Sequence, residues 1–156
     1  MKRTWKHLLI CLAIPLAVGG LSAWLTHGSM KAFEALEQPP LSPPGWLFPI
    51  VWTILYLLMG WASYQVYTAN VPERQSGRAL SIYALQLAVN FFWSIFFFNM
   101  EWYLFSFFWL LLLWVLILIM IFLFGRIEPS TRWKLIPYLL WVTFAGYLNL
   151  GIWLLN

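Results

Sequence analysis

The chain has 156 residues and a net charge of +4, and 63% of its residues are hydrophobic, 21% aromatic and only 9% charged. Soluble domains carry about 25% charged residues, so this composition excludes a water-exposed globule and, with it, a basic nucleic-acid-binding domain. The length predicts a single domain, embedded in a membrane.

The charged residues fall in five short clusters and leave five charge-free runs, each at least 22 residues long. A helix that rises about 1.5 Å per residue crosses about 30 Å of hydrocarbon in about 20 residues. The sequence therefore predicts an all-α integral membrane protein with a five transmembrane helix bundle. The approximate limits of the spans are 8–26, 45–67, 79–98, 103–124 and 134–154.

The first predicted helix follows three basic residues, as a signal peptide does. Its apolar stretch, 8–25, is longer than the roughly 7–15 residues of a signal sequence and lacks a clear small-residue cleavage site, so we interpret it as a span. Cys11 is the only cysteine, which excludes an intramolecular disulfide and a cysteine-based metal site. His7 and His27 flank the helix, and we expect them to face solvent or headgroups rather than bind haem or a metal.

We predict that residues 27–44 form a long loop on the outer side of the membrane. Met30, Phe33 and Leu36 have helical spacing, and the run 38–45 that follows is rich in proline. Proline fixes φ and is excluded from helix interiors, so the run predicts a stiff lid or collar and excludes a sixth span. Long ordered loops are usually functional.

The positions of the basic residues predict an orientation. The N-terminus and the connectors 67–79 and 125–134 lie on one side of the predicted bundle, and they hold eight of the nine Lys and Arg residues. By the positive-inside rule, the N-terminus is cytoplasmic and the C-terminus is outside.

Three of the predicted helices carry a stripe of small, polar and aromatic residues, whereas the fourth has no hydroxyl or amide after Ser106. In lipid such residues report helix contacts better than apolar ones do. We therefore expect the stripes to face one another and the fourth helix to be the most exposed to lipid. The stripes are Trp52, Tyr56, Met59 or Gly60, Ser63 and Tyr67; Gln86, Asn90, Trp93 and Phe97; and Tyr138, Trp141, Ala145 and Leu148 or Asn149.

Trp52, Asn90 and Trp141 lie 8 to 12 residues from the outer ends of their helices. At about 1.5 Å per residue, all three fall within roughly 12–18 Å of the outer surface. They predict one cavity under the loop, with aromatic walls and the Asn90 amide as its polar group. Two alternatives stay open: the tryptophans pack the helices together, and Gln86 and Asn90 only join helices.

Several chemistries are excluded. No charged residue lies in the interior of a predicted span, which argues against a proton relay or a voltage sensor. The chain has no Asp, all its Glu residues lie in connectors, and no nucleotide-binding or metalloprotease motif occurs. We expect no metal site and no required cofactor.

Three segments resemble the signatures of the tryptophan-rich sensory protein and translocator protein family. They are PPLSPPGW (39–46) with VWTILYLLMG (51–60), NFFWSIFFF (90–98), and PYLLWVTFAGYLN (137–149). Together with the five spans, the resemblance covers essentially the whole chain.

The resemblance implies a homodimer of five-helix subunits, with a pocket under the first loop. The pocket would bind protoporphyrin IX, haem-type tetrapyrroles and benzodiazepine-type ligands. Its ligand-binding positions, carried over by matching motif and with Tyr138 added from the stripe, are Phe33, Pro44, Trp52, Tyr56, Asn90, Trp93, Tyr138, Trp141 and Ala145.

Three functions follow from the resemblance and the residues together. The first is a receptor or sensor of planar hydrophobic ligands, linked to tetrapyrrole homeostasis or stress. The second is an enzyme that degrades protoporphyrin with light and oxygen, with Trp52 and Trp141 as its catalytic residues. The third is a porphyrin or lipid carrier. No Lys or Arg follows Tyr147, so the cholesterol motif of the animal members is incomplete; this favours a bacterial plasma membrane.

Overall fold

In the computed structural model, which describes residues 4–156, the chain is a bundle of long helices without strands in that range. Five helices are long and apolar enough to cross a membrane, which confirms the predicted fold class. The elements are α1 (Trp5–Thr26), the 3₁₀ turn η1 (His27–Ser29), α2 (Met30–Glu34), α3 (Leu47–Tyr67), α4 (Glu73–Ser94), the π-helical turn η2 (Ile95–Asn99), α5 (Tyr103–Ile127) and α6 (Thr131–Leu155).

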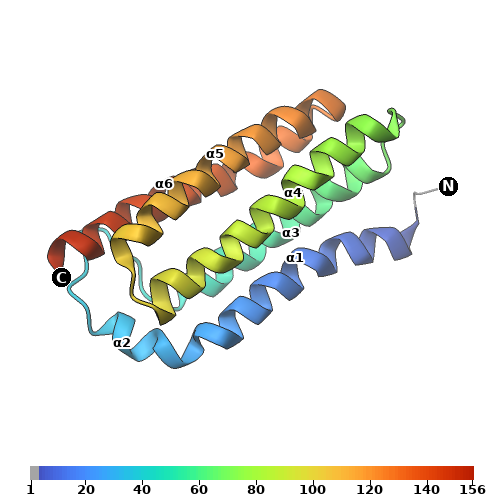
Figure 1. Cartoon of the computed structure of the whole chain (residues 1–156). Coiled ribbons are helices and arrows are strands. Elements are labelled where there is room, and N and C mark those ends of the chain that lie inside the picture. Colours follow the sequence, from blue (N-terminus) through green and yellow to red (C-terminus); the bar gives the residue numbers. More distant parts are fainter. Residues whose placement is uncertain (1–3) are drawn as a thin grey trace.

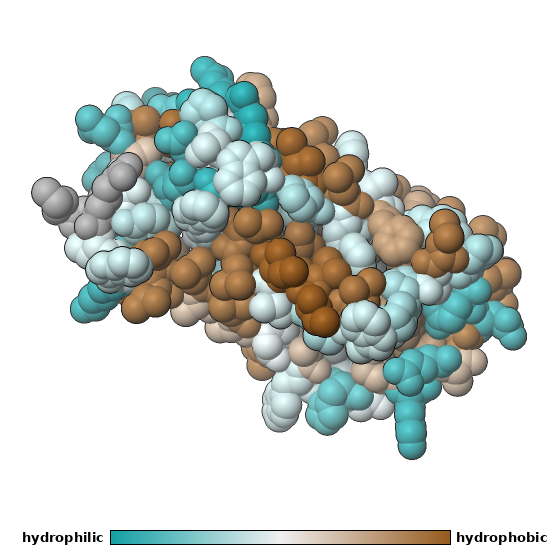
Figure 2. Space-filling view, turned by 180° about the vertical axis from the view of Figure 1, so that it is seen from behind, coloured by the Kyte–Doolittle hydropathy of each residue, from teal (hydrophilic) through white to brown (hydrophobic). Residues whose placement is uncertain are grey.

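The helices run roughly along one axis, with α2 and the C-terminus at one end and the N-terminus at the other (Figure 1). Around the bundle they follow the order α1, α3, α6, α5, α4, so that neighbours in space are not always neighbours in sequence. Hydrophobic side chains form a band across the middle, and hydrophilic ones gather at the two ends (Figure 2). This distribution is that of an integral membrane protein.

The prediction that the fourth span is the most exposed to lipid is wrong. In the most apolar window of α1 only 11% of the residues are buried, against 33% in that of α5. The helix α5 packs between α4 and α6 through a stripe of fully buried apolar residues, Leu113, Ile117 and Met120. Apolar side chains are equally suited to contacts between helices and to contacts with lipid. The prediction relied on polar residues to identify helix contacts, and it therefore missed the packed face of α5.

Several helices extend beyond their predicted limits. The helix α6 begins at Thr131 rather than at residue 134, which places Lys134 inside it. Lys134 is 2% exposed. Its Nζ donates to Oε1 of Gln65 on α3 and lies 4.1 and 4.7 Å from the ring centroids of Trp61 and Trp133. A desolvated cation between aromatic rings contributes about 2 kcal/mol, so this lysine joins α3 to α6.

The helices α1 and α3 approach each other closely at Gly60. A Cβ at this position would lie 2.7 Å from the backbone oxygen of Cys11 and 3.0 Å from Cα of Leu12. Both atoms belong to the backbone, so no side-chain rotation relieves the overlap. Gly60 therefore sets the spacing between the two helices.

We predict that Gly60→Ala destabilises the protein by about 1–3 kcal/mol, because α1 and α3 must separate. Gly77 on α4 is the matched control, since a Cβ there meets nothing within 4 Å. Gly77→Ala should stabilise the helix by about 0.5–1 kcal/mol. Thermal unfolding of the detergent-solubilised variants measures both effects, and equal melting temperatures for the two variants would contradict the contact.

Candidate functional site

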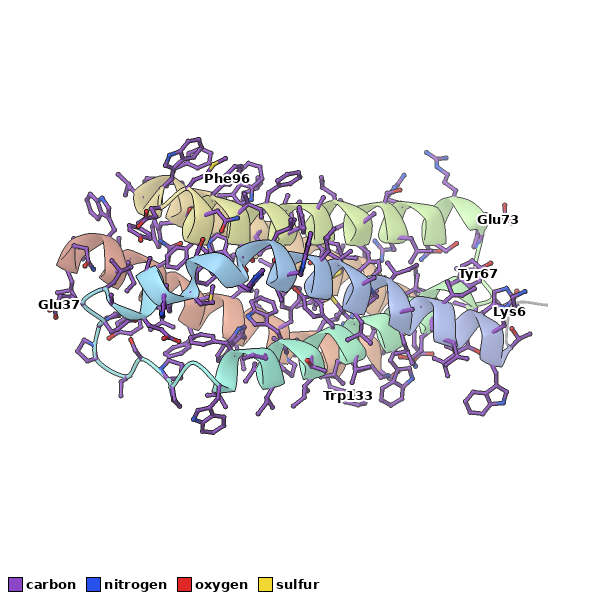
Figure 3. The ribbon with its side chains drawn as sticks, turned by 90° about the horizontal axis from the view of Figure 1, so that it is seen from below. Lys6, Glu37, Tyr67, Glu73, Phe96 and Trp133 are labelled. Atoms are coloured by element: carbon purple, nitrogen blue, oxygen red, sulfur yellow. The ribbon has the colours of Figure 1, made fainter. Side chains whose placement is uncertain are left out.

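A cavity of about 670 Å³ lies between α1, α3, α4 and α6, beneath α2 and the segment 35–46. We call this segment the lid. Small-molecule sites usually measure about 300–1,000 Å³. Glu37 marks the lid end of the bundle in Figure 3, opposite the end marked by Lys6, Tyr67 and Glu73. The lining residues reach no further from the lid than Leu16 on α1 and Tyr56 on α3, so the cavity occupies one half of the bundle.

Two tryptophans from different helices form a corner of the cavity wall. The rings of Trp52 on α3 and Trp141 on α6 are 6.5 Å apart between centroids and nearly perpendicular, at 87°. Tyr56 stacks on Trp52 at 5.5 Å, and Phe48 contacts Trp141 edge-on at 5.8 Å. Such aromatic contacts hold each indole in a defined orientation.

The opposite wall comes from the end of α4 and the turn η2. Trp93 donates its indole N–H to Oδ1 of Asn149 at 3.0 Å and stacks on Phe97 at 5.2 Å with an interplanar angle of 17°. Phe33 of α2 packs edge-on against Phe97 and Phe98, at 5.7 and 5.1 Å. Phe97 and Phe98 are adjacent in sequence and both line the cavity. The sequence predicted a regular helix up to residue 98, so the π-helical turn was not expected. Such turns are frequent at functional sites.

The lid is fastened to the C-terminal part of α6. Tyr147 donates its hydroxyl to the carbonyl oxygen of Pro40 at 2.6 Å. Asn156 accepts from the backbone N–H of Glu37 and donates to its carbonyl oxygen, at 3.2 and 3.0 Å. Pro39 is buried against Gly151, where a Cβ would lie 2.6 Å from the proline ring. The proline-rich segment thus folds back over the bundle as a collar.

A buried hydrogen-bonded chain lies beneath the cavity. Asn90 donates from Nδ2 to the hydroxyl of Tyr138 at 2.8 Å, and this hydroxyl donates to Oε1 of Gln86 at 2.6 Å. All three residues are at most 2% exposed. Tyr138 does not line the cavity itself; its ring packs edge-on against Trp52 of the wall, at 6.2 Å between centroids. The chain joins α4 to α6.

The structure brings six of the nine predicted ligand-binding residues into the cavity wall and leaves three outside it. Asn90 and Tyr138 belong to the hydrogen-bonded group beneath the cavity. Pro44 is exposed on the lid, between two lining residues, Pro43 and Gly45. The six lining residues are Phe33, Trp52, Tyr56, Trp93, Trp141 and Ala145.

Sequence reasoning missed the wall that α1 contributes. Gly19 and Gly20 line the cavity, as do small or hydroxyl-bearing residues further along the helix. Gly19 leaves room for the ring of Tyr56, which a Cβ would overlap. The Gly19–Gly20 pair within an apolar helix was the one feature of the sequence that could have indicated space for a cavity beside α1. The further lining residues of α1 are Leu16, Ser22, Ala23 and Thr26, and His27 of η1 follows them.

The lining residues include one carboxylate, Glu34, and neither Lys nor Arg. Their uncharged hydrogen-bonding groups include Gln38 of the lid and Asn149 of α6. Within residues 4–156, no three His, Cys, Asp or Glu side chains are grouped to hold a metal ion. The arrangement favours stacking on flat, apolar molecules, and it offers no pair of carboxylates for acid–base catalysis.

The comparisons with known proteins agree on one family. Residues 11–154 match the sequence model of the TspO/MBR family. The chain is 36% identical to Tryptophan-rich protein TspO of Chlorobaculum tepidum, over 100% of this chain and 99% of that protein. It is 33% identical to Protein CrtK of Rhodobacter capsulatus (80% and 78% covered) and 31% identical to Translocator protein of Bos taurus (98% and 92% covered).

We predict that Tyr138→Phe destabilises the protein by about 1–3 kcal/mol, because it leaves Asn90 and Gln86 without their shared partner in an apolar interior. Tyr64→Phe is the control, since Tyr64 is half-buried and takes no part in the hydrogen bonds among Gln86, Tyr138 and Asn90. Melting temperatures in detergent compare the two. If both variants melt together, the hydrogen-bonded chain does not stabilise the bundle.

Proposed function

The chain belongs to the TspO/MBR family, and on this premise we propose that it is a membrane receptor for porphyrins, such as protoporphyrin IX, and other flat hydrophobic ligands. The observation that carries the proposal is the corner formed by Trp52 and Trp141 inside a cavity of about 670 Å³. The likeness to proteins named for their tryptophan content supports it.

Because the two indole planes are nearly perpendicular, a planar macrocycle would stack on one of them and meet the other at its edge, with Trp93 and Phe97 also in the cavity wall. Each aromatic contact contributes about 0.5–1.5 kcal/mol beyond the burial of apolar area. Burial itself contributes about 25 cal/mol per Å² removed from water. Stacking of this kind selects for flatness rather than for one compound, which suits a receptor of several ligands.

The charge at the cavity determines how a porphyrin enters. Protoporphyrin carries two carboxylates, and Glu34 is the one ionic group among the lining residues. Two like charges 4 Å apart repel by about 1 kcal/mol in bulk water and more near a protein surface. The carboxylates would therefore point away from Glu34, and the apolar edge of the macrocycle would enter first.

The contact between the two indoles also favours a second candidate, the light- and oxygen-dependent degradation of protoporphyrin. The bound porphyrin would absorb light and be oxidised, molecular oxygen would be the oxidant and be reduced, and Trp52 or Trp141 would relay an electron from the one to the other and end unchanged. We do not propose the third function, a carrier, because the cavity is confined to one half of the bundle.

We further propose that the protein is a homodimer in a bacterial plasma membrane, with the N-terminus in the cytoplasm. The charges support this orientation. Arg74 and Arg78 lie near the start of α4, and Arg126 and Arg132 lie at the connection between α5 and α6, so the end of the bundle opposite the lid is basic.

Titration of the full-length protein in detergent with protoporphyrin, in the dark and under light with oxygen, tests the function. We expect saturable binding in the dark, largely kept by the double variant Trp52→Phe, Trp141→Phe. Conversion of several equivalents to one defined product in light by the wild type alone would favour the enzyme. No saturable binding in the dark would refute the receptor.

The position of Glu34 makes a separate prediction. Glu34→Gln should raise the affinity for protoporphyrin about two- to fivefold, because it removes up to about 1 kcal/mol of repulsion. The affinity for the uncharged dimethyl ester should not change. Glu37→Gln is the control, since Glu37 does not line the cavity. An equal gain for the acid and the ester would contradict the charge argument.

A further inference from the structure

Two arginines lie at the connection between α5 and α6, at the end of the bundle opposite the lid (Figure 1). Arg126 belongs to the last turn of α5 and Arg132 to the first turn of α6, and both side chains are exposed. The connecting segment, residues 128–130, is short. Neither arginine lines the cavity, so the function proposed for the cavity does not explain them.

Packing holds both guanidinium groups against the surface of α5. The side chain of Arg132 crosses Gly125, where an added Cβ would lie 2.8 Å from Cζ of the arginine. Cζ of Arg126, the next residue along α5, lies 5.6 Å from the ring centroid of Phe122. Two guanidinium groups that belong to different helices therefore lie on the same turn of α5. The absence of a side chain at Gly125 makes room for the second of them.

Neither guanidinium group is neutralised by a carboxylate. Within residues 4–156, no ion pair and no hydrogen bond is found for the side chain of Arg126 or of Arg132. Glu128 is the carboxylate of the connecting segment, and its Oε1 accepts from the backbone N–H of Ser130 at 3.3 Å. A guanidinium group has five N–H donors and no acceptor, so both groups are able to donate to an anion from outside the chain.

An exposed apolar stripe begins directly beside these arginines. Phe122 lies one turn before Arg126 on α5 and is 58% exposed. From Phe122 to Leu111 the helix rises about 17 Å, at about 1.5 Å per residue. This length is close to half of the roughly 30 Å thickness of the hydrocarbon, so the stripe matches the depth of one leaflet. Its members, with helical spacing, are Phe122, Leu118, Val115 and Leu111.

We propose that Arg126 and Arg132 together bind the phosphate of an anionic phospholipid, whose acyl chains lie along the apolar stripe of α5. Guanidinium groups match the oxygens of a phosphate in planar, bidentate pairs. Basic pockets between transmembrane helices bind acidic lipid headgroups. The site is separate from the cavity and does not depend on the function proposed for it.

The charge of the site favours an anionic lipid over a zwitterionic one. A zwitterionic phospholipid has the same phosphate but brings a cation of its own, which two unpaired arginines repel. The phosphate would also join α5 to α6, since each helix supplies one arginine. A bound lipid should therefore raise the melting temperature, as any ligand does that binds only the folded state.

The test uses the full chain in detergent, titrated separately with phosphatidylglycerol and with phosphatidylcholine of identical acyl chains. Native mass spectrometry measures the affinity for the first bound lipid. The test variant is Arg126→Gln with Arg132→Gln. The matched control is Arg74→Gln with Arg78→Gln, which removes the same charge from the same end of the bundle. Phosphatidylcholine monitors the fold and the apolar surface of each variant.

We expect the wild type and the control to bind phosphatidylglycerol at least about tenfold more tightly than phosphatidylcholine, since each arginine near an acidic headgroup contributes about fivefold. The test variant should lose this preference and keep its affinity for phosphatidylcholine. Phosphatidylglycerol should raise the melting temperature of the wild type and of the control but not that of the test variant.

Three results would overturn the inference. A wild type without a preference for phosphatidylglycerol would exclude the site. An equal loss of preference in the two double variants would show that the charge of this end attracts the lipid without a specific site. Inorganic phosphate at the same concentration as the lipid should not displace it; if it does, the arginines bind a free anion and not a lipid. The titration with protoporphyrin is unaffected by each of these results.

Discussion

Hydrocarbon offers no hydrogen-bond partner, and the structure of this protein depends on that constraint. Backbone groups in the membrane must pair within helices, which leaves long helices as the solution for an apolar chain of this length. The same constraint acts on buried side chains. Gln86, Asn90 and Tyr138 form one chain, and the single lysine inside α6 pairs with Gln65 between two indole rings. Each of these contacts ties α6 to another helix and makes their relative position specific.

The apolar character of the cavity wall follows from the hydrogen bonds that the buried polar side chains make with one another. Asn90 and Tyr138 satisfy each other below the cavity, so its wall is left to aromatic rings. These rings are rigid and brace one another: Trp52 is held by Tyr56, and Trp93 is held by Asn149. A wall of this kind keeps its shape mainly through ring contacts, with the Trp93–Asn149 hydrogen bond as a polar support. Glycines on α1 supply the room, and the lid, docked on the end of α6, covers the opening.

Recognition at this site would therefore be divided between two regions. The interior stacks on any flat apolar molecule of suitable size. At the rim, Glu34 would distinguish one such molecule from another by its charge. Such a division would let the proposed receptor accept several tetrapyrroles and still bind each with a different affinity.

The sequence by itself determined the class of protein, the number of spans and most of the aromatic wall. Span length is set by bilayer thickness, and the alternating direction of successive helices places Trp52 and Trp141 at one depth. Other features were decided only by the tertiary structure: the pairing of Asn90 with Tyr138, the burial of Lys134, the packing of α5 and the α1 wall of the cavity. Helical spacing defines a face but not the helix that it meets. Likewise, the π-helical turn changes the faces of the residues around it, and no periodicity in the sequence marks it.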